Sequence, residues 1–296
     1  MFLKFKVKDK KYQNINQILK QEFDISARLL HKLIINEHVL LNNVRTDTRS
    51  LVNIGDIITV NLNFEEESEN IVSKNMKLNI VYEDDVLLII NKPIGTAVHP
   101  SVLHYEDSLS NGVKFYFESI GLKRKVRPVN RLDFNTSGLI IFAKNEYVQE
   151  CLIKQMNTHI FQKKYIAIVS GNFKTKVGRI NLPIARKENS IIERGVSDSG
   201  QEAITDYEVL KEFKIDSSCV SVVKCSLRTG RTHQIRVHMA EIGHPLLGDS
   251  MYGTASNLIS RQALHSYEIS FIHPISLKKL EFICDLPEDM KKICTL

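Results

Sequence analysis

The chain has 296 residues, of which 43% are hydrophobic and 25% are charged. This balance is typical of a globular protein and excludes an intrinsically disordered chain, and the length suits two domains of roughly 100 to 200 residues each. The net charge of +6 and the pI near 8.9 are compatible with a polyanionic partner but do not identify one.

The cysteines and the N-terminus indicate a protein of a reducing compartment. The five cysteines are scattered, odd in number and never spaced as Cys-x-x-Cys, which argues against a disulfide framework or a zinc site. The first eight residues alternate apolar residues with lysines, which predicts a strand and not a signal peptide. No run in the sequence approaches the roughly 20 apolar residues that cross a bilayer. We therefore expect a soluble, cytoplasmic protein.

Residues 1–63 are expected to form a small first domain. Residues 1–62 carry ten Lys and Arg against six Asp and Glu, a net charge of +4, which is most of the excess of the chain. Apolar residues at three-to-four spacing predict short helices near 15–19 and 29–34, the second with Ser26 as its N-cap. Residues 39–43 and 57–62 predict strands.

Residues 64–75 are polar and acid-rich, and they predict an interdomain linker that lies off the path of a polyanionic ligand. Residues 76–296 form the second domain. Strands are expected at 78–82, 86–91, 139–143, 165–170, 203–210, 220–227, 263–271 and 280–284, and helices at 108–116, 146–157 and 232–242. Because this order is no regular βαβ alternation, the sequence favours an α+β fold with a central, largely antiparallel mixed β-sheet.

One carboxylate, Asp133, lies in a loop that leads into a buried strand. The segment Arg127-Pro-Val-Asn-Arg-Leu-Asp-Phe-Asn-Thr-Ser-Gly138 precedes the apolar run 139–143. Such loops are common homes for catalytic residues, and Arg131 could keep the carboxylate ionised for a role as nucleophile or general base. The alternative is that Asp133 and Asn135 build an Asx turn. The segment alone leaves both interpretations open.

The same segment resembles the signature of the RluA family of RNA pseudouridine synthases, which has His-Arg-Leu-Asp, two variable residues and Thr-Ser-Gly. Further blocks agree in order and spacing, among them Asn91-Lys-Pro-Ile-Gly95, 163–171, 229–239, 243–249 and 264–274. The resemblance extends over residues 77–290. It implies the pseudouridine synthase fold and the isomerisation of uridine in RNA to pseudouridine, with no metal or other cofactor.

The resemblance also implies roles for individual residues. Asp133 matches the catalytic aspartate, and whether it attacks the sugar or the uracil ring stays open. Tyr165 matches the tyrosine that packs on the base and helps to remove the proton from C5. Arg231 matches the arginine that pairs with the catalytic carboxylate. Arg131 matches the arginine that assists extrusion of the target nucleotide, which must leave its stack to reach a buried pocket.

Residues 1–63 resemble the S4 RNA-binding domain in the pattern Ile15-Asn-Gln-Ile-Leu, Ser26-Ala-Arg and Val52-Asn-Ile-Gly-Asp-Ile-Ile. This resemblance implies that Arg28, His31 and Lys32 contact phosphates without sequence preference from the second helix. Glu37 departs from the pattern, because the family often has glycine there. The alternative is that the two helices pack against the catalytic domain and bind nothing.

Other polar positions leave alternatives open. Lys164, with Lys163, precedes Tyr165 and would either contact a phosphate at the RNA entry or end a strand in solvent. The polar stretch 178–200 would be a loop over RNA or an exposed insert. Asn130 stands where the family has histidine, and we expect it to alter RNA contacts more than activity.

A metal site is not expected. His233 and His238 are five positions apart on the predicted helix, about 140° around its axis, which does not suit the i, i+4 pairing of zinc helices.

The favoured function is a monomeric pseudouridine synthase acting on structured RNA, with large-subunit ribosomal RNA preferred as the substrate. A glycosidic hydrolase using Asp133 is a second interpretation, but it lacks the second carboxylate that such enzymes commonly need. A third is an RNA-binding protein with a silent synthase domain, against which the presence of Asp133, Tyr165 and Arg231 argues.

Overall fold

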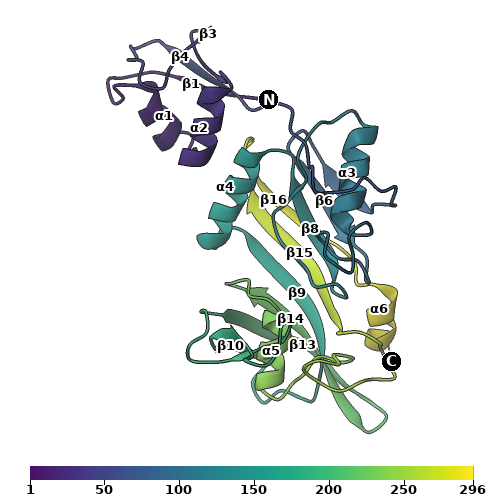
Figure 1. Ribbon diagram of the computed structural model, residues 1–296. Coiled ribbons are helices and arrows are strands. Elements are labelled where there is room, and N and C mark those ends of the chain that lie inside the picture. The colour runs from purple at the N-terminus through teal and green to yellow at the C-terminus, as the bar shows by residue number, and fades with distance from the viewer. Residues whose placement is uncertain (296) are drawn as a thin grey trace.

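The computed structural model describes residues 1–295, which form a small N-terminal unit and a large sheet with helices packed on it (Figure 1). The N-terminal unit contains β1 (Phe2–Lys6), α1 (Ile15–Gln21), α2 (Ala27–Ile35), β2 (Val39–Leu41), β3 (Val44–Arg45) and β4 (Ile57–Asn61). Its strands lie in the order β1-β4-β2-β3. The Asn14 and Ser26 side chains cap α1 and α2 by accepting backbone N–H groups of their first turns, as predicted for Ser26.

A ten-stranded sheet carries the rest of the chain, in the order β10-β13-β14-β9-β15-β8-β6-β5, with β16 on β15 and β7 on β8. All its pairings are antiparallel except that of β15 with β8. Its strands are β5 (Ile80–Glu83), β6 (Leu87–Lys92), β7 (Arg127–Pro128), β8 (Ser137–Ala143), β9 (Gln162–Ser170), β10 (Val177–Asn181), β13 (Ile204–Ile215), β14 (Ser218–Leu227), β15 (Leu264–Ile272) and β16 (Lys279–Ile283). This arrangement confirms the predicted α+β class.

Helices cover both faces of this sheet, which is why β8 is buried along its whole length. Ile140 and Phe142 belong to the same apolar cluster as α3 (Leu109–Ser119), whereas Leu139 and Ile141 belong to the cluster of α4 (Glu146–Asn157). A strand covered on both faces is expected to be apolar without alternation. The buried strand predicted after Asp133 is therefore confirmed.

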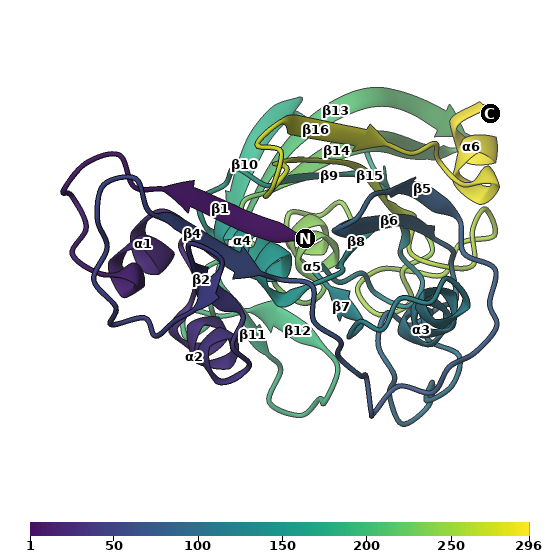
Figure 2. The ribbon, with the colours of Figure 1, turned by 90° about the horizontal axis from the view of Figure 1, so that it is seen from above.

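The alternation of β9 decides which of its side chains reach the site. Tyr165, Ala167 and Val169 share a cluster with α5 (Gln234–Glu241), and Ile166 and Ile168 share one with α6 (Glu288–Thr295). Successive side chains of a strand point to opposite faces. Tyr165 therefore faces the side of α5, which lies on the same side of the sheet as α3 (Figure 2).

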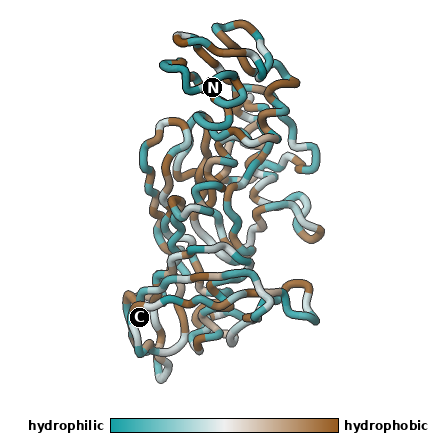
Figure 3. Tube along the Cα trace, turned by 90° about the vertical axis from the view of Figure 1, so that its left-hand side faces the viewer, coloured by the Kyte–Doolittle hydropathy of each residue, from teal (hydrophilic) through white to brown (hydrophobic). Residues whose placement is uncertain are grey.

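Residues 64–75 contain no helix or strand but lie against the second domain. The Ser68 hydroxyl accepts the Val126 amide at 2.8 Å, and Lys114 Nζ donates to the Ile71 carbonyl at 2.8 Å. Apolar stretches occur both in the N-terminal unit and along the large sheet (Figure 3), and one apolar cluster joins buried residues of α1 and α2 with those of β6, β8 and α4. The segment expected to be a linker therefore packs against the second domain through these contacts.

The predicted helices and strands of the second domain are present within a few residues, and the bounds of α4 coincide with the prediction. The structure adds the short hairpin of β11 (Ile184–Arg186) and β12 (Arg194–Val196), strands β7 and β10, and helix α6. Within residues 1–295 no helix has the length and apolarity needed to cross a membrane.

Candidate active site

A cavity of about 810 Å³ opens between the loop that precedes β8, the start of β9, the loop after β14 and the first turn of α5. Asp133, Tyr165 and Arg231, the three predicted catalytic residues, all line it. So do Arg131 and Lys163. The fold thus brings the separate sequence blocks together around one space.

The loop that carries Asp133 is held through its backbone. Lys92 Nζ donates to the Phe134 carbonyl at 2.9 Å, and Arg261 Nη1 donates to the Asn135 carbonyl at 3.1 Å. The Asp133 side chain is 26% exposed, so its carboxylate reaches the cavity from a fixed loop. Within residues 1–295 this carboxylate contacts side chains and accepts no backbone amide, unlike the aspartate of an Asx turn.

Gly138 fixes where this loop joins the sheet. Its φ is +112°, and a Cβ built on it would lie 2.2 Å from the Ser266 carbonyl oxygen of the neighbouring strand β15. Only glycine combines that dihedral with so close an approach of two backbones. The glycine of the Thr-Ser-Gly signature is thus explained by strand packing.

Lys92 was missed as a site residue, although it lies in the Asn91-Lys-Pro-Ile-Gly95 block. Its side chain is fully buried, and Nζ donates to the carbonyls of Pro93, Thr96 and Phe134 at 2.8–2.9 Å. Three acceptors satisfy all three ammonium protons. Burial lowers the pKa of Lys92 to about 7, against the opposing charge of Asp133. Lys92 therefore ties the end of β6 to the Asp133 loop.

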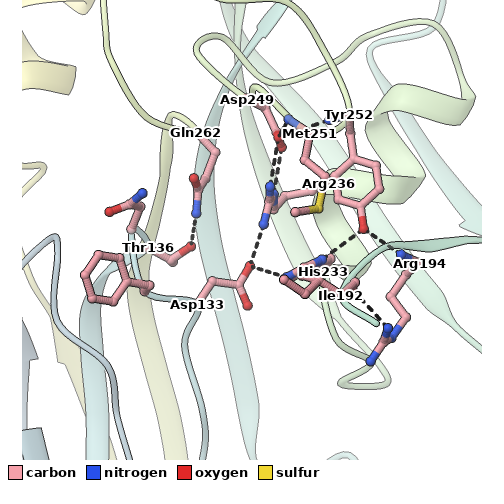
Figure 4. A network of polar contacts seen from close by, with 12 residues as sticks. Asp133, Thr136, Ile192, Arg194, His233, Arg236, Asp249, Met251, Tyr252 and Gln262 are labelled. Carbon is pink, nitrogen blue, oxygen red and sulfur yellow. Dashed lines mark hydrogen bonds and ion pairs between the residues drawn. The ribbon is translucent and has the colours of Figure 1, made fainter. Parts of the chain in front are cut away.

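Arg236 on α5 joins two carboxylates (Figure 4). Its Nη1 lies 3.3 Å from Asp133 Oδ2, while Nε and Nη2 donate to the two oxygens of Asp249 at 2.7 and 2.8 Å. The Asp249 side chain is fully buried and also accepts the amides of Met251 and Tyr252. Burial alone would raise the pKa of Asp249, but the hydrogen bonds and charge of Arg236 outweigh it and hold that pKa below its usual value. Arg236 is thereby fixed as the cation beside Asp133.

The pairing expected for Arg231 is therefore wrong. Arg231 is exposed on the loop before α5, and its Nε donates to the Glu202 carbonyl at 2.9 Å. The helix begins at Gln234 and not at the predicted 232, so Arg231 lies outside it and Arg236 occupies its inner face. Arg231 still lines the cavity and remains available to a bound ligand.

Tyr165 is 5% exposed and lies in the wall of the cavity. Burial raises the pKa of its phenol, and the negative charge of Asp133 adds to this, so the hydroxyl stays protonated at neutral pH. Tyr165 therefore contributes a protonated phenol to the wall of the cavity.

Lys164, expected either at the RNA entry or at a solvent-exposed strand end, is paired with an acidic residue of the neighbouring strand. Its Nζ forms an ion pair with Glu268 of β15 at 2.5 Å, and it does not line the cavity. Lys163 lines the cavity instead, because it shares the strand face of Tyr165 two residues away. No acidic partner of Lys163 occurs within the described part of the chain, and burial lowers its pKa.

Arg131 and Asn130 differ in exposure. Arg131 is exposed at the cavity, as a residue that meets RNA would have to be. Asn130 is 6% exposed; its amide nitrogen donates to the Leu139 carbonyl at 3.3 Å, and its oxygen accepts the Ile141 amide at 2.9 Å. Asn130 therefore extends the backbone pairing of β7 with β8, which gives this departure from the family pattern a structural reason.

Two of the three cations predicted on α2 contact acidic residues outside the N-terminal unit. Lys32 pairs with Glu66 and, at 3.3 Å, with Glu146 of α4, and Arg28 Nε lies 3.3 Å from Glu146. His31 is exposed. The helix therefore packs against the second domain, and a phosphate would compete with two carboxylates for Lys32.

The polar stretch 178–200 contains the hairpin of β11 and β12, which contacts the segment after α5 through Arg194. The Tyr252 hydroxyl accepts the backbone amide of Arg194 in β12 at 2.8 Å, and the same oxygen lies 2.9 Å from His233 Nδ1.

Both imidazole nitrogens of His238 lie within hydrogen-bond distance of protein atoms, the Thr205 hydroxyl and the Leu182 carbonyl. Among residues 1–295, no three His, Cys, Asp or Glu side chains gather as a metal site would require.

Comparisons with known proteins agree with this geometry. Residues 86–241 match the family described as RNA pseudouridylate synthase. A Bacillus subtilis (strain 168) protein described as the uncharacterized RNA pseudouridine synthase YhcT is 36% identical over 277 residues, 94% of this chain and 91% of its own. A Vibrio cholerae protein described as ribosomal large subunit pseudouridine synthase D is 34% identical over 294 residues, 94% of this chain and 89% of its own.

A solved structure supports the fold. Human RNA pseudouridylate synthase domain containing 1 superposes with a TM-score of 0.59 at 24% identity, over 75% of this chain and 86% of that one. The family match spans the Asp133 loop, β9 and α5, which are the elements that line the cavity. The chain therefore belongs to the RluA-type family of RNA pseudouridine synthases and is an isomerase that modifies RNA.

Proposed function

We propose that this enzyme converts uridine to pseudouridine in structured RNA, with large-subunit ribosomal RNA as its substrate and Asp133 as its catalytic group. The observation that carries the proposal is the cavity in which Asp133, held by Arg236, shares the wall with Tyr165. The name of the Vibrio cholerae relative supports the choice of ribosomal RNA.

The proposed reaction needs little beyond these residues. The N-glycosidic bond breaks and leaves its electron pair on N1, the uracil turns within the cavity, and its C5 bonds to the sugar C1′. C5 then loses its proton and N1 gains one, so that the product is an isomer of uridine. Asp133 acts on the sugar or on the uracil ring through its carboxylate, and the guanidinium of Arg236 lies 3.3 Å from one of its oxygens. The Tyr165 phenol is protonated at neutral pH, so it is a poor base. We therefore propose that its main role is to pack against the base, and that its role in removing the C5 proton is secondary.

Access to the cavity requires the target nucleotide to leave its stack. We propose that Arg131 assists this step, since it is exposed beside Asp133. We also propose that the enzyme acts as a monomer in the cytoplasm; the similarity to the Vibrio cholerae protein named for ribosomal RNA supports this location.

We further propose that residues 1–63 are an S4-like RNA-binding domain. The net charge of +4 over residues 1–62 and the exposure of His31 and Arg28 on α2 support it. Deleting residues 1–63 should weaken RNA binding and flatten its salt dependence, while conversion of a short RNA is reduced less. A truncated protein that binds RNA at full strength would refute this role.

The experiment that tests the function is a map of pseudouridines in total RNA from cells with and without the protein. We expect one or more sites in large-subunit ribosomal RNA to revert to uridine in its absence. Sites lost in another RNA would overturn the substrate, and an unchanged map would overturn the function. Restoring the cells with the wild-type chain, but not with Asp133→Asn, should restore those sites.

A further inference from the structure

His233 has an uncommon backbone conformation at the wall of the cavity. It is the residue before α5, with φ 59° and ψ 18°, and it lines the cavity with its side chain 10% exposed. Few residues other than glycine adopt this left-handed conformation, and histidine is among the more tolerant ones. Such conformations persist where the surroundings impose them, often at functional sites. The turn points the imidazole toward Asp133 (Figure 4).

The contacts of Tyr252 are the basis on which we assign the imidazole nitrogen that carries the proton. The Tyr252 oxygen accepts the Arg194 amide at 2.8 Å and lies 2.9 Å from His233 Nδ1. Because the oxygen already accepts that amide, we assign its own proton to the contact with Nδ1. Nδ1 is then an acceptor, and in the neutral ring Nε2 carries the hydrogen.

The surroundings keep the ring neutral. Burial is the main cause that lowers the pKa of His233; the carboxylates Asp133 and Asp249 oppose it, and the guanidinium groups of Arg236 and Arg194 add to it. A neutral imidazole remains a hydrogen-bond donor through one nitrogen.

The Nε2–H group has no acceptor of its own. It lies 3.9 Å from Asp133 Oδ2, too far for a hydrogen bond, and Arg236 already approaches that oxygen at 3.3 Å. Within the described residues the imidazole makes one hydrogen bond, the one to Tyr252. A donor is therefore aimed into the cavity beside the carboxylate that acts on the nucleotide.

We propose that His233 is a further catalytic residue, which donates a hydrogen bond from Nε2 to a carbonyl oxygen of the target uracil. This assignment rests on the proposed function. When the N-glycosidic bond breaks, the bonding electron pair stays with the uracil, and its negative charge spreads onto the carbonyl oxygens. A fixed donor at such an oxygen stabilises the transition state more than the bound substrate, so it acts on kcat.

The test is single-turnover pseudouridine formation by His233→Asn and His233→Gln. Asparagine tolerates the left-handed backbone but its amide does not reach the position of Nε2, whereas the longer glutamine amide does. We expect His233→Asn to lower the rate about 100-fold, with an RNA dissociation constant within about twofold, and His233→Gln to regain about tenfold of that loss. His159→Asn is the control, because His159 also has a left-handed backbone (φ 60°). Its thermal unfolding measures how much stability is lost when histidine is replaced by asparagine at such a position.

The pH profile separates a donor from a base. Both the neutral and the protonated imidazole donate from Nε2, so wild type and His233→Asn should lose activity at the same acid pH. An acid limb that vanishes in His233→Asn would assign a base role and overturn the donor. An unchanged rate, or weaker binding alone, would also overturn it. If the wild-type protein converted no uridine in any RNA, the proposed function itself would be wrong. If the wild type is active and His233→Asn is equally active, only the role of His233 is rejected.

Discussion

The clamp of Arg236 between two carboxylates predicts a large stability effect from one substitution. In Arg236→Met the unbranched side chain fills much of the same space but leaves Asp249 fully buried and without its cation. Two charge-assisted hydrogen bonds of 2.7 and 2.8 Å are lost. Breaking a buried pair from one side costs about 3–5 kcal/mol, because an uncompensated charge remains. We therefore expect the free energy of unfolding at pH 7 to fall by about that amount.

The pH dependence gives the prediction its sign. In the wild type the pKa of Asp249 is held below its usual value, so this group stabilises the fold at neutral pH, and that contribution is lost as the pH falls through the lowered pKa. In Arg236→Met, burial without a partner raises the pKa of Asp249, and its protonation on acidification relieves the destabilisation. The difference in the free energy of unfolding between wild type and Arg236→Met should be largest at pH 7 and should become smaller toward pH 4.

The assay is equilibrium unfolding in urea at both pH values, with two further variants. Arg228→Met removes an ion pair with Asp206 at 2.9 Å whose side chains are 45% and 24% exposed, so it should cost less than about 1 kcal/mol. Arg236→Met combined with Asp249→Leu removes both charges and should recover most of the loss. A difference below about 1 kcal/mol for Arg236→Met, or one independent of pH, would refute the reasoning.

Two more predictions follow from paired residues. Lys163→Ala should reduce the slope of log RNA affinity against log salt concentration by about one, because Lys163 lines the cavity. Lys164→Ala should leave that slope unchanged, because Lys164 is paired with Glu268. Filter binding measures both slopes, and equal slopes for the two variants would contradict the assignment. Gly138→Ala should lower the free energy of unfolding more than Gly121→Ala does. Gly121 also has a positive φ, +69°, but a Cβ built on it meets open space, so the difference between the two losses measures the clash of residue 138 with Ser266. Chemical denaturation measures both losses, and equal values would argue against the clash.

Local patterns predicted the elements that a single physical signal governs. The apolar spacing of α4 and the apolar run of β8 are strong because a helix stripe or a doubly covered strand leaves few alternatives. In α4 and β8, near neighbours along the chain carry the information. The joint position of Asp133 and Tyr165 at one cavity was expected from the family resemblance and not from a local pattern.

The errors concern side chains whose direction depends on a turn or on a distant partner. Arg231 and Arg236 lie in one block, and only the left-handed turn at His233, which starts the helix at Gln234, decides which of them reaches Asp133. The pair Lys163 and Lys164 could have been resolved, because the two-residue period of a strand puts Lys163 on the face of Tyr165. The contacts of Lys32 with Glu66 and Glu146 depend on domain packing, for which the sequence carries no local signal.

The central claim is that Asp133 performs the chemistry, and the replacement Asp133→Asn tests it most directly. The amide is nearly isosteric, and Arg236 keeps Asp249 as its main partner, so the fold and RNA binding should persist. We predict that single-turnover assays on large-subunit ribosomal RNA detect no pseudouridine from Asp133→Asn, at protein concentrations where wild type and variant bind the RNA equally. Pseudouridine formation by Asp133→Asn at the wild-type rate would contradict the account.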